Sequence, residues 1–240
     1  MAKRPYVLLS VAMSIDGYID DASDTPLALS NEADFDRVDE VRAGCDAILV
    51  GAGTIRADDP RLLVRSPSRR ADRVLRGLTE TPLKVTITRD ADLDPGRRFF
   101  SLGDVEKIVY ATSPCADKAR DRLSGVATIV DAGDPLDLPA VLSDLSARGV
   151  TRLMVEGGQA VHTLFLTSGL VDELHLVIAP FFVGDSRAAR FITDGAFPHN
   201  PANPLRLAET RPIGDVVLLR YLPTAPSIPS EPPHLPDEPR

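Results

Sequence analysis

Short apolar runs alternate with amphipathic stretches over the first two thirds of the chain. Runs typical of buried strands cover 6–13, 46–50, 83–88, 107–110, 126–130 and 152–155. Between them, the patterns over 31–43, 116–123, 138–148 and 159–167 favour helices. Strands that alternate with helices predict an α/β fold with a largely parallel sheet covered on both faces.

The first of these helices has a clear start signal. Ser30 or Asn31 can cap its N-terminus, and acidic residues crowd its first turns, where the helix dipole favours them. Phe35, Val38 and Val41 recur at helical spacing. We therefore expect these three side chains to form its buried face.

The C-terminal third has a different pattern. Strand-like runs cover 172–179, 206–210 and 216–221, and no helical pattern separates the last two. Such short connections require antiparallel pairing, so we expect a mixed sheet with an antiparallel C-terminal portion. From Pro223 onward the chain has seven prolines in 18 residues. We expect one folded domain over 1–222 and a disordered or extended tail over 223–240.

Composition narrows the class of protein. The chain has 240 residues, 43% of them hydrophobic, and a formal net charge of −8, which argues against a nucleic-acid-binding surface. No secretory signal and no apolar stretch of the ~20 residues that a membrane span needs is evident, so we expect a cytoplasmic protein. Cys45 and Cys115 form no CxxC pattern and are interpreted as reduced thiols. The four histidines lack metal-ligand spacing, and we expect no metal site.

Two junctions between a predicted strand and a predicted helix carry glycine. They are Val50-Gly51-Ala52-Gly53-Thr54 and Val155-Glu156-Gly157-Gly158-Gln159. Ligands of open α/β sheets bind beyond the carboxyl ends of the strands, where glycine lets the backbone approach and a helix start attracts phosphate. Together the junctions suit a dinucleotide pyrophosphate. Each alone could be a tight turn, and neither completes the GxGxxG pattern.

Three arginines could bind phosphate groups. Arg89, just past a predicted strand, could meet the 2′-phosphate of a dinucleotide. Arg42 and Arg65 could hold a substrate phosphate at the same pocket mouth, since arginine binds phosphate with a planar fork. Solvated surface charge is the alternative interpretation for all three.

Three carboxylates stand at turns. Asp16 could be a turn residue and Asp58 a helix-terminal cap. Glu156 lies between an apolar strand and two glycines, so we expect it to point into a cleft. There it could hydrogen-bond a polar heterocycle or a ribose hydroxyl.

Several motifs in this order carry a family resemblance. They are Ser14-Ile15-Asp16-Gly17, the segment from Gly51 to Arg65, Val155-Glu156-Gly157-Gly158, the segment from Gly169 to Glu173, and Ile178-Ala179-Pro180. Together they resemble the reductase half of the bifunctional riboflavin deaminase-reductase and its stand-alone archaeal and fungal counterparts. The similarity runs from about Tyr6 to Tyr221.

The resemblance implies a dihydrofolate-reductase-like three-layer sandwich, NADPH as the hydride donor and a homodimer. It implies a reductase that converts a ribosylaminopyrimidine 5′-phosphate to its ribityl form in riboflavin biosynthesis. Asp58 and Glu156 are the candidate catalytic residues, and the proton donor is left open between water, the substrate's own groups and Asp58. Arg42, Leu62, Arg65 and Glu156 fall on substrate-contacting positions. The implied cofactor-binding residues are Gly51, Gly53, Thr54, Asp58, Arg89, Gly157, Gly158, Gln159, Ala160, Val161, His162 and Thr163.

The chain departs from the family pattern in three places. Ser10 stands where the bifunctional enzymes usually carry lysine, the loop 20–29 lacks a Ser-x-Trp-like segment, and no zinc-deaminase motif is present. One alternative is therefore a reductase of the same fold with another pterin- or pyrimidine-like substrate, or a specialised-metabolite precursor. The absence of tryptophan argues against a true dihydrofolate reductase. A non-catalytic nucleotide-binding domain is the other alternative.

Overall fold

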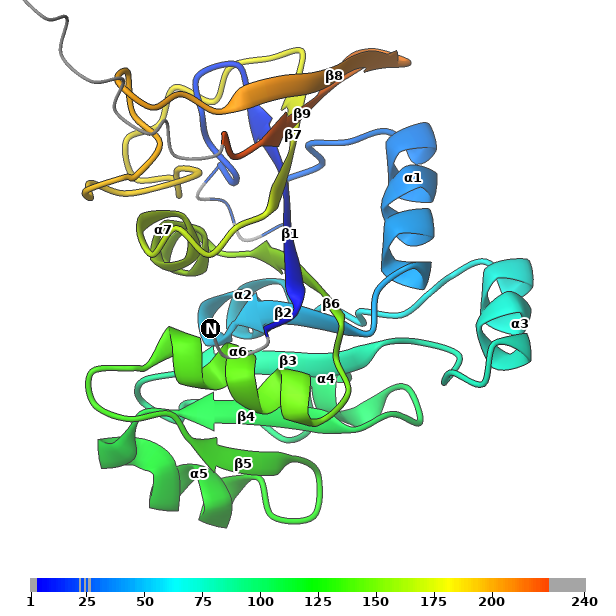
Figure 1. Ribbon diagram of the computed structural model, residues 1–240, viewed down its shortest axis with the longest axis vertical. Coiled ribbons are helices and arrows are strands. Elements are labelled where there is room, and N and C mark those ends of the chain that lie inside the picture. The colour runs from blue at the N-terminus through cyan, green and yellow to red at the C-terminus, as the bar shows by residue number, and fades with distance from the viewer. Residues whose placement is uncertain (1–3, 22, 24, 26, 225–240) are drawn as a thin grey trace, which may run out of the picture.

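A computed structural model describes residues 4–21, 23, 25 and 27–224 of the chain. The predicted tail falls outside the described residues from position 225 on. The described chain forms one nine-stranded sheet with the strand order β5-β4-β3-β2-β6-β1-β7-β9-β8, flanked by helices (Figure 1). No helix within these residues is both long and apolar enough to cross a membrane.

The elements alternate along the chain much as the hydrophobic pattern predicts. The strands are β1 (Tyr6–Ser14), β2 (Ala47–Gly51), β3 (Leu83–Thr88), β4 (Lys107–Ala111), β5 (Thr128–Asp131), β6 (Arg152–Gly157), β7 (Glu173–Ala179), β8 (Arg206–Ile213) and β9 (Val216–Leu222). The α-helices are α1 (Glu32–Ala43), α2 (Ala52–Asp58), α3 (Pro67–Leu75), α4 (Arg98–Ser101), α5 (Ala116–Arg122), α6 (Leu138–Ala147) and α7 (Gln159–Thr167).

The sheet is mixed, as predicted. Strands β1 to β7 pair in parallel, and β9 joins β7 in antiparallel orientation. Strand β8 then pairs antiparallel with β9 at the sheet edge. The two-residue connection between β8 and β9 allows only this orientation, because a parallel pairing needs a long crossover.

Helices cover both faces of the sheet and complete the predicted three layers. On one face, apolar side chains of α6 and α7, such as Leu142 and Phe165, pack against the sheet strands. On the other face, α2 and α4 contribute Ile55 and Phe99 to a second core. Figure 1 places α1 and α3 on the opposite side of the sheet from α7.

Helix α1 corrects one prediction. Asn31 caps it as expected, through a bond from the Asp34 N–H to the Asn31 side chain. Phe35, however, is 38% exposed, and the buried positions of the helix include Asp34, Arg37 and Asp39. The expected apolar face is therefore wrong at Phe35. Charged side chains take the inner face because each finds a partner there.

The hydrophobic pattern misses two short helices, α3 and α4, whereas α2 is the helix expected after the first glycine junction. Helix α3 begins at Pro67, with Ser66 as its cap, and carries four charged residues in nine. Its few apolar positions give no buried stripe to detect, and its buried side chain is Arg73. Cys45 and Cys115 are buried and free, in agreement with their interpretation as thiols.

Candidate active site

The separation of two central strands opens a cleft at the carboxyl end of the sheet. The β1–β6 pairing ends at Leu9 and Val155, and farther along β1 pairs only with β7. Ser10 and Ala12 beyond this point on β1, and Glu156 on β6, line a cleft of about 880 Å³. The cleft therefore lies where open α/β sheets bind their ligands.

The first glycine junction forms part of one wall. Gly51, at the end of β2, packs closely against α7, because a Cβ there would lie 2.9 Å from Val161 Cγ2. A Cβ on Gly53 would meet no atom within 4 Å. Gly51, Gly53 and Thr54 all line the cleft. Gly53 thus leaves its backbone open to a ligand, whereas Gly51 is required by close packing.

The second glycine junction faces the first. Gly158 has φ +88° and ψ 136°, a backbone region that L side chains rarely adopt, and a Cβ there would lie 2.9 Å from Thr54 Oγ1. Gly158, Gln159 and Ala160 line the cleft at the start of α7. The free N–H groups of a helix start attract phosphate oxygens, so the two junctions fit a dinucleotide pyrophosphate.

Two arginines lie in the cleft near the end of β3, and they differ in their partners. Arg56 donates to the Asp92 carbonyl at 2.9 Å and forms an ion pair with Asp90 at 3.6 Å. Arg89 lines the cleft and has no hydrogen bond or ion pair within the described residues. The Arg89 guanidinium is therefore available to a ligand phosphate.

Arg42 and Glu156 form a bidentate ion pair in the cleft. Arg42 Nε and Nη2 lie 2.6 and 2.5 Å from the two carboxylate oxygens of Glu156. Their side chains are 20% and 12% exposed, so the pair is largely shielded from water but still reaches the cleft. The sequence predicts both residues without predicting that they bind each other. In the structure, Glu156 holds two of the guanidinium nitrogens of Arg42.

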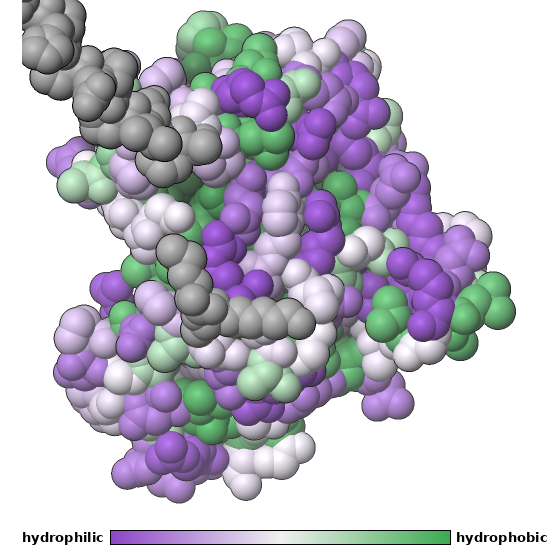
Figure 2. All heavy atoms as spheres, viewed as in Figure 1, coloured by the Kyte–Doolittle hydropathy of each residue, from purple (hydrophilic) through white to green (hydrophobic). Residues whose placement is uncertain are grey.

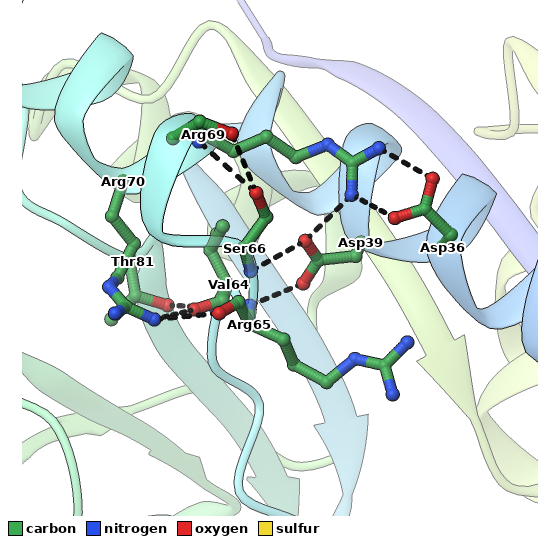
Figure 3. Close-up of polar contacts among 9 residues, drawn as sticks. Asp36, Asp39, Val64, Arg65, Ser66, Arg69, Arg70 and Thr81 are labelled. Atoms are coloured by element: carbon green, nitrogen blue, oxygen red, sulfur yellow. Dashed lines mark hydrogen bonds and ion pairs between the residues drawn. The ribbon is translucent and has the colours of Figure 1, made fainter.

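Arg65 reaches the same cleft, and its guanidinium has no hydrogen bond or ion pair with any of the residues that the structure describes. Its own N–H and that of Ser66 both donate to the buried Asp39 carboxylate, to which Arg69 Nη1 also donates at 3.0 Å (Figure 3). Burial alone would raise the pKa of Asp39, but these three donors outweigh it and lower the pKa. Asp39 thus fixes the backbone from which Arg65 extends over the Phe35 ring, 5.7 Å from its centroid.

Asp58 is a solvent-exposed residue whose carboxyl group lines the cleft. Its side chain has no hydrogen-bond partner within the described residues. Partial burial of the carboxyl group, and to a smaller extent the negative charge of Asp20, raise its pKa above the ordinary value. Asp20 also lines the cleft. Asp58 therefore keeps a proton to higher pH than an aspartate surrounded by water does.

Other predicted residues have different environments. Leu62, at 2% exposure, belongs to the hydrophobic core and does not line the cleft. Gly157 and Thr163 also lie off its lining, whereas Val161 and His162 line it. Burial lowers the pKa of His162 to about 4. Asp16 accepts hydrogen bonds from the N–H groups of residues 183 and 184, as its turn interpretation expects.

Sequence reasoning missed five charged residues that line the cleft, namely Asp20, Asp34, Arg37, Arg56 and Asp90. Of these, Asp34 and Arg37 are buried. Hydrophilic residues dominate the surface over α1 in Figure 2, which illustrates why charges on this helix are easily interpreted as solvated. The sequence held one indication of these buried charges. The α1 segment has too few apolar residues to form the whole of the buried face that a helix next to the sheet requires.

The chain matches known proteins along most of its length. The model of the RibD C-terminal domain covers residues 5–219. A 2,5-diamino-6-ribosylamino-4(3H)-pyrimidinone 5′-phosphate reductase from Methanothermobacter thermautotrophicus is 38% identical over 222 residues, which are 91% of this chain and 98% of that protein. The reductase of the same name from Archaeoglobus fulgidus is 38% identical over 194 residues, which are 80% of this chain and 87% of that protein.

The structural likeness supports the same fold. A pyrimidine reductase-like protein from Corynebacterium diphtheriae superposes with a TM-score of 0.77 at 22% identity and 92% coverage of both chains. RibD from Acinetobacter baumannii gives a TM-score of 0.74 at 23% identity, with 92% of this chain and 58% of that chain covered. The expected dihydrofolate-reductase-like α/β fold is confirmed.

Proposed function

This chain belongs to the RibD C-terminal domain family, and we propose that it is the NADPH-dependent reductase that converts a ribosylaminopyrimidine 5′-phosphate to its ribityl form in riboflavin biosynthesis. Its relatives are named as reductases of this pathway, and the chain is an oxidoreductase of the same kind. Reductases of this kind use a nicotinamide cofactor.

The observation that carries the proposal is the arrangement of one cleft between two unlike walls. One wall has the glycine junctions and the start of α7, which fit a dinucleotide. The other wall has Arg65, whose guanidinium is set by Asp39, and the Arg42–Glu156 pair. A cofactor and a phosphorylated substrate can thus lie side by side, which is the arrangement that hydride transfer needs.

The reaction requires a hydride and a proton. When bound, the nicotinamide cofactor supplies the hydride. The ribose ring opens to an imine-like form, a C–H bond forms at C1′, and a proton completes the ribitylamine. Asp58 is the side chain of the cleft best suited to hold that proton on its carboxyl group, because its pKa is raised by partial burial and by Asp20. Glu156, held by Arg42, orients a hydroxyl or a ring N–H of the substrate.

The preference for NADPH over NADH is assigned to Arg89. It lies in the cleft at the end of β3, and none of the described residues forms a hydrogen bond or an ion pair with its guanidinium. A guanidinium without a partner binds a 2′-phosphate as a forked donor. The homodimer and the cytoplasmic location stay predictions from the family resemblance and from composition.

The substrate class can be narrowed by the relatives. Both archaeal reductases at 38% identity are named for the diaminopyrimidinone, the form that still carries the 2-amino group. Ser10, in place of the lysine of the bifunctional enzymes, lies in the cleft. We therefore expect the undeaminated substrate to react faster than the deaminated uracil form.

The direct test is an assay of NADPH oxidation with the two ribosylaminopyrimidine phosphates in parallel. We expect consumption of NADPH with both or with the diaminopyrimidinone alone, and the ribityl product by mass spectrometry. No consumption with either compound would contradict the proposed function. It would favour a reductase of this fold that acts on another heterocycle.

A further inference from the structure

A chain of buried charged groups leads from Glu173 and His175 on β7 to Arg37 and Asp34 on α1, which line the cleft. Arg37 Nε donates to Asp34 Oδ1 at 2.6 Å, and Arg37 Nη1 lies 3.3 Å from His175 Nδ1. His175 Nε2 lies 2.9 Å from Glu173 Oε1. These four residues are at most 8% exposed. Burying this much charge costs free energy even when the groups are paired. The function proposed above gives these four residues no role.

The network fixes the guanidinium of Arg37 in one orientation. Bonds from His175, Arg220 and Tyr6 outweigh burial and lower the pKa of Glu173 to about 2, so Glu173 is ionised and accepts the Nε2–H of His175. That leaves the lone pair of His175 Nδ1 to accept from Arg37 Nη1. Asp34 takes the Nε–H on the other side.

The remaining end of this guanidinium is open. Arg37 Nη2 donates to no atom of the described residues and is not sealed from solvent, and Arg37 lines the cleft. An arginine held by two buried partners, with one end free in a cleft, is preorganised to donate to a ligand oxygen.

The surroundings indicate which part of the ligand lies there. Ala12 of β1 is paired with Val177 of β7, and both line the cleft on the same face as Ser10. Val38, one helical position beyond Arg37, and Leu29 also line it. Small and apolar side chains of this kind suit the faces of a flat heterocycle, with one oriented donor for its polar edge.

We propose that Arg37 binds an exocyclic oxygen of the pyrimidine ring through Nη2, and that Asp34 and His175 are the positioning residues that hold it there. The proposal rests on the proposed function and adds a site for the ring to the phosphate site at Arg65. The two arginines then divide the substrate between them. Arg37 binds the ring end, and Arg65 binds the phosphate end.

The test compares two ligands that differ by the ring. Isothermal titration is performed with the ribitylaminopyrimidine 5′-phosphate product and with ribitol 5-phosphate, on the wild type, Arg37→Gln, Arg65→Gln and the exposed Arg61→Gln as a matched control. Arg37→Gln should weaken the ring-containing product by ~10–100-fold and leave ribitol 5-phosphate unchanged, because one charge-assisted hydrogen bond is lost. Arg65→Gln should weaken both ligands, and Arg61→Gln neither.

Two further variants separate recognition from folding. Arg37→Lys keeps the charge but loses the fork, and we expect it to bind the product as weakly as Arg37→Gln does. His175→Gln should weaken the product by a few-fold, again without an effect on ribitol 5-phosphate. Thermal melting checks that each variant is folded, and steady-state kinetics should show a raised KM with a smaller change in kcat.

Distinct outcomes overturn the inference and the proposed function. If the wild type turns over and Arg37→Gln binds the product normally, Arg37 does not contact the ring. If Arg37→Gln weakens both ligands equally, Arg37 acts on the phosphate end or through the fold, and the inference is wrong. If the wild type binds neither ligand and oxidises no NADPH, the proposed function itself fails.

Discussion

The two walls of the cleft differ in the groups that they offer to a ligand. The cofactor wall depends on backbone, since Gly53 leaves open space in the cleft where a side chain would stand, and Gly158 has a positive φ and a Cβ position only 2.9 Å from Thr54 Oγ1. The substrate wall depends on charged side chains: Asp34 and Arg37 are buried and bonded to each other, and the buried Asp39 holds the backbone of Arg65 and Ser66. The cofactor wall should therefore lose affinity when an atom is added to its backbone. The substrate wall should lose activity when a charge is removed.

The largest effect is expected from an added methyl group on the cofactor wall. Gly158→Ala places a Cβ 2.9 Å from Thr54 Oγ1 at a residue with φ +88°. Both the close contact and the backbone strain displace the start of α7 from the cleft. We expect the affinity for NADPH to fall by ~100-fold or more (~2.7 kcal/mol) in a fluorescence titration.

The matched control for this variant is Gly149→Ala. Gly149 also has positive φ, at +89°, but a Cβ there meets no atom within 4 Å, and it does not line the cleft. It should lose stability through backbone strain, by ~1 kcal/mol, and bind NADPH normally. Equal loss of NADPH binding in the two variants would show that strain anywhere disturbs the site, against a backbone-built wall.

A removed charge on the substrate wall should have the next largest effect. Glu156→Gln keeps the size of the side chain but breaks the bidentate pair with Arg42, because an amide nitrogen then faces a guanidinium. Loss of one charged hydrogen bond to the substrate corresponds to ~10–100-fold in kcat/KM. Circular dichroism should remain unchanged, and the affinity for NADPH should change little.

Glu106→Gln supplies the comparison for a surface charge. Glu106 pairs with Arg148 at 3.2 Å, outside the cleft, with 41% of its side chain exposed. Its activity should equal that of the wild type, since such exposed pairs contribute little. Full activity of Glu156→Gln would remove Glu156 from the substrate wall.

The difference between the two walls also explains which parts of the structure could be predicted from the sequence. The parallel strands, the antiparallel end and the glycine junctions are local patterns, so hydrophobic periodicity and glycine placement were sufficient for the sheet and the cofactor wall. The Arg42–Glu156 pair joins positions 114 residues apart, and no local pattern encodes it. The resemblance predicted both residues but gave no indication of the contact between them.

Helix α1 illustrates why the substrate wall was harder. Asp34, Arg37 and Asp39 resemble solvated charges when only their own helix is considered, and Phe35 resembles a core residue. Their burial depends on partners from other elements, namely His175 on β7 for Arg37 and the backbone of Arg65 for Asp39. A pattern along one segment cannot contain such partners.

The buried charged network behind the substrate wall should also make the stability of the protein sensitive to acid. Glu173 has a pKa near 2 in the folded protein, against an ordinary 4.5, so the unfolded chain binds its proton first as pH falls. The stability it contributes is full above about pH 4.5 and is lost as pH falls toward 2. Glu173→Gln should therefore lower the free energy of unfolding by ~2 kcal/mol at pH 7, and the difference from wild type should shrink below pH 4.5.

Urea unfolding at a series of pH values measures this difference directly. Asp185 is the comparison, because Arg187 also lowers its pKa to about 2, but the group lies on the surface. Asp185→Asn should change stability little at any pH, since an exposed pair is screened by water. A Glu173→Gln difference that stays constant from pH 7 to pH 3 would contradict the ionised, buried Glu173 of the network.

The smallest expected effect concerns Arg89, the side chain of the cofactor wall to which the preference for NADPH is assigned. Arg89 has no partner in the described residues, whereas its neighbour Arg56 is engaged by Asp90 and by the Asp92 carbonyl. Arg89→Met should reduce the preference for NADPH over NADH by ~10-fold, about one charged hydrogen bond in a solvent-exposed site. Arg56→Met should leave the preference intact, because its guanidinium is already bound. If Arg56→Met removes the preference and Arg89→Met does not, the 2′-phosphate lies against the paired arginine, and the lack of a partner within the described residues does not predict the role of an arginine.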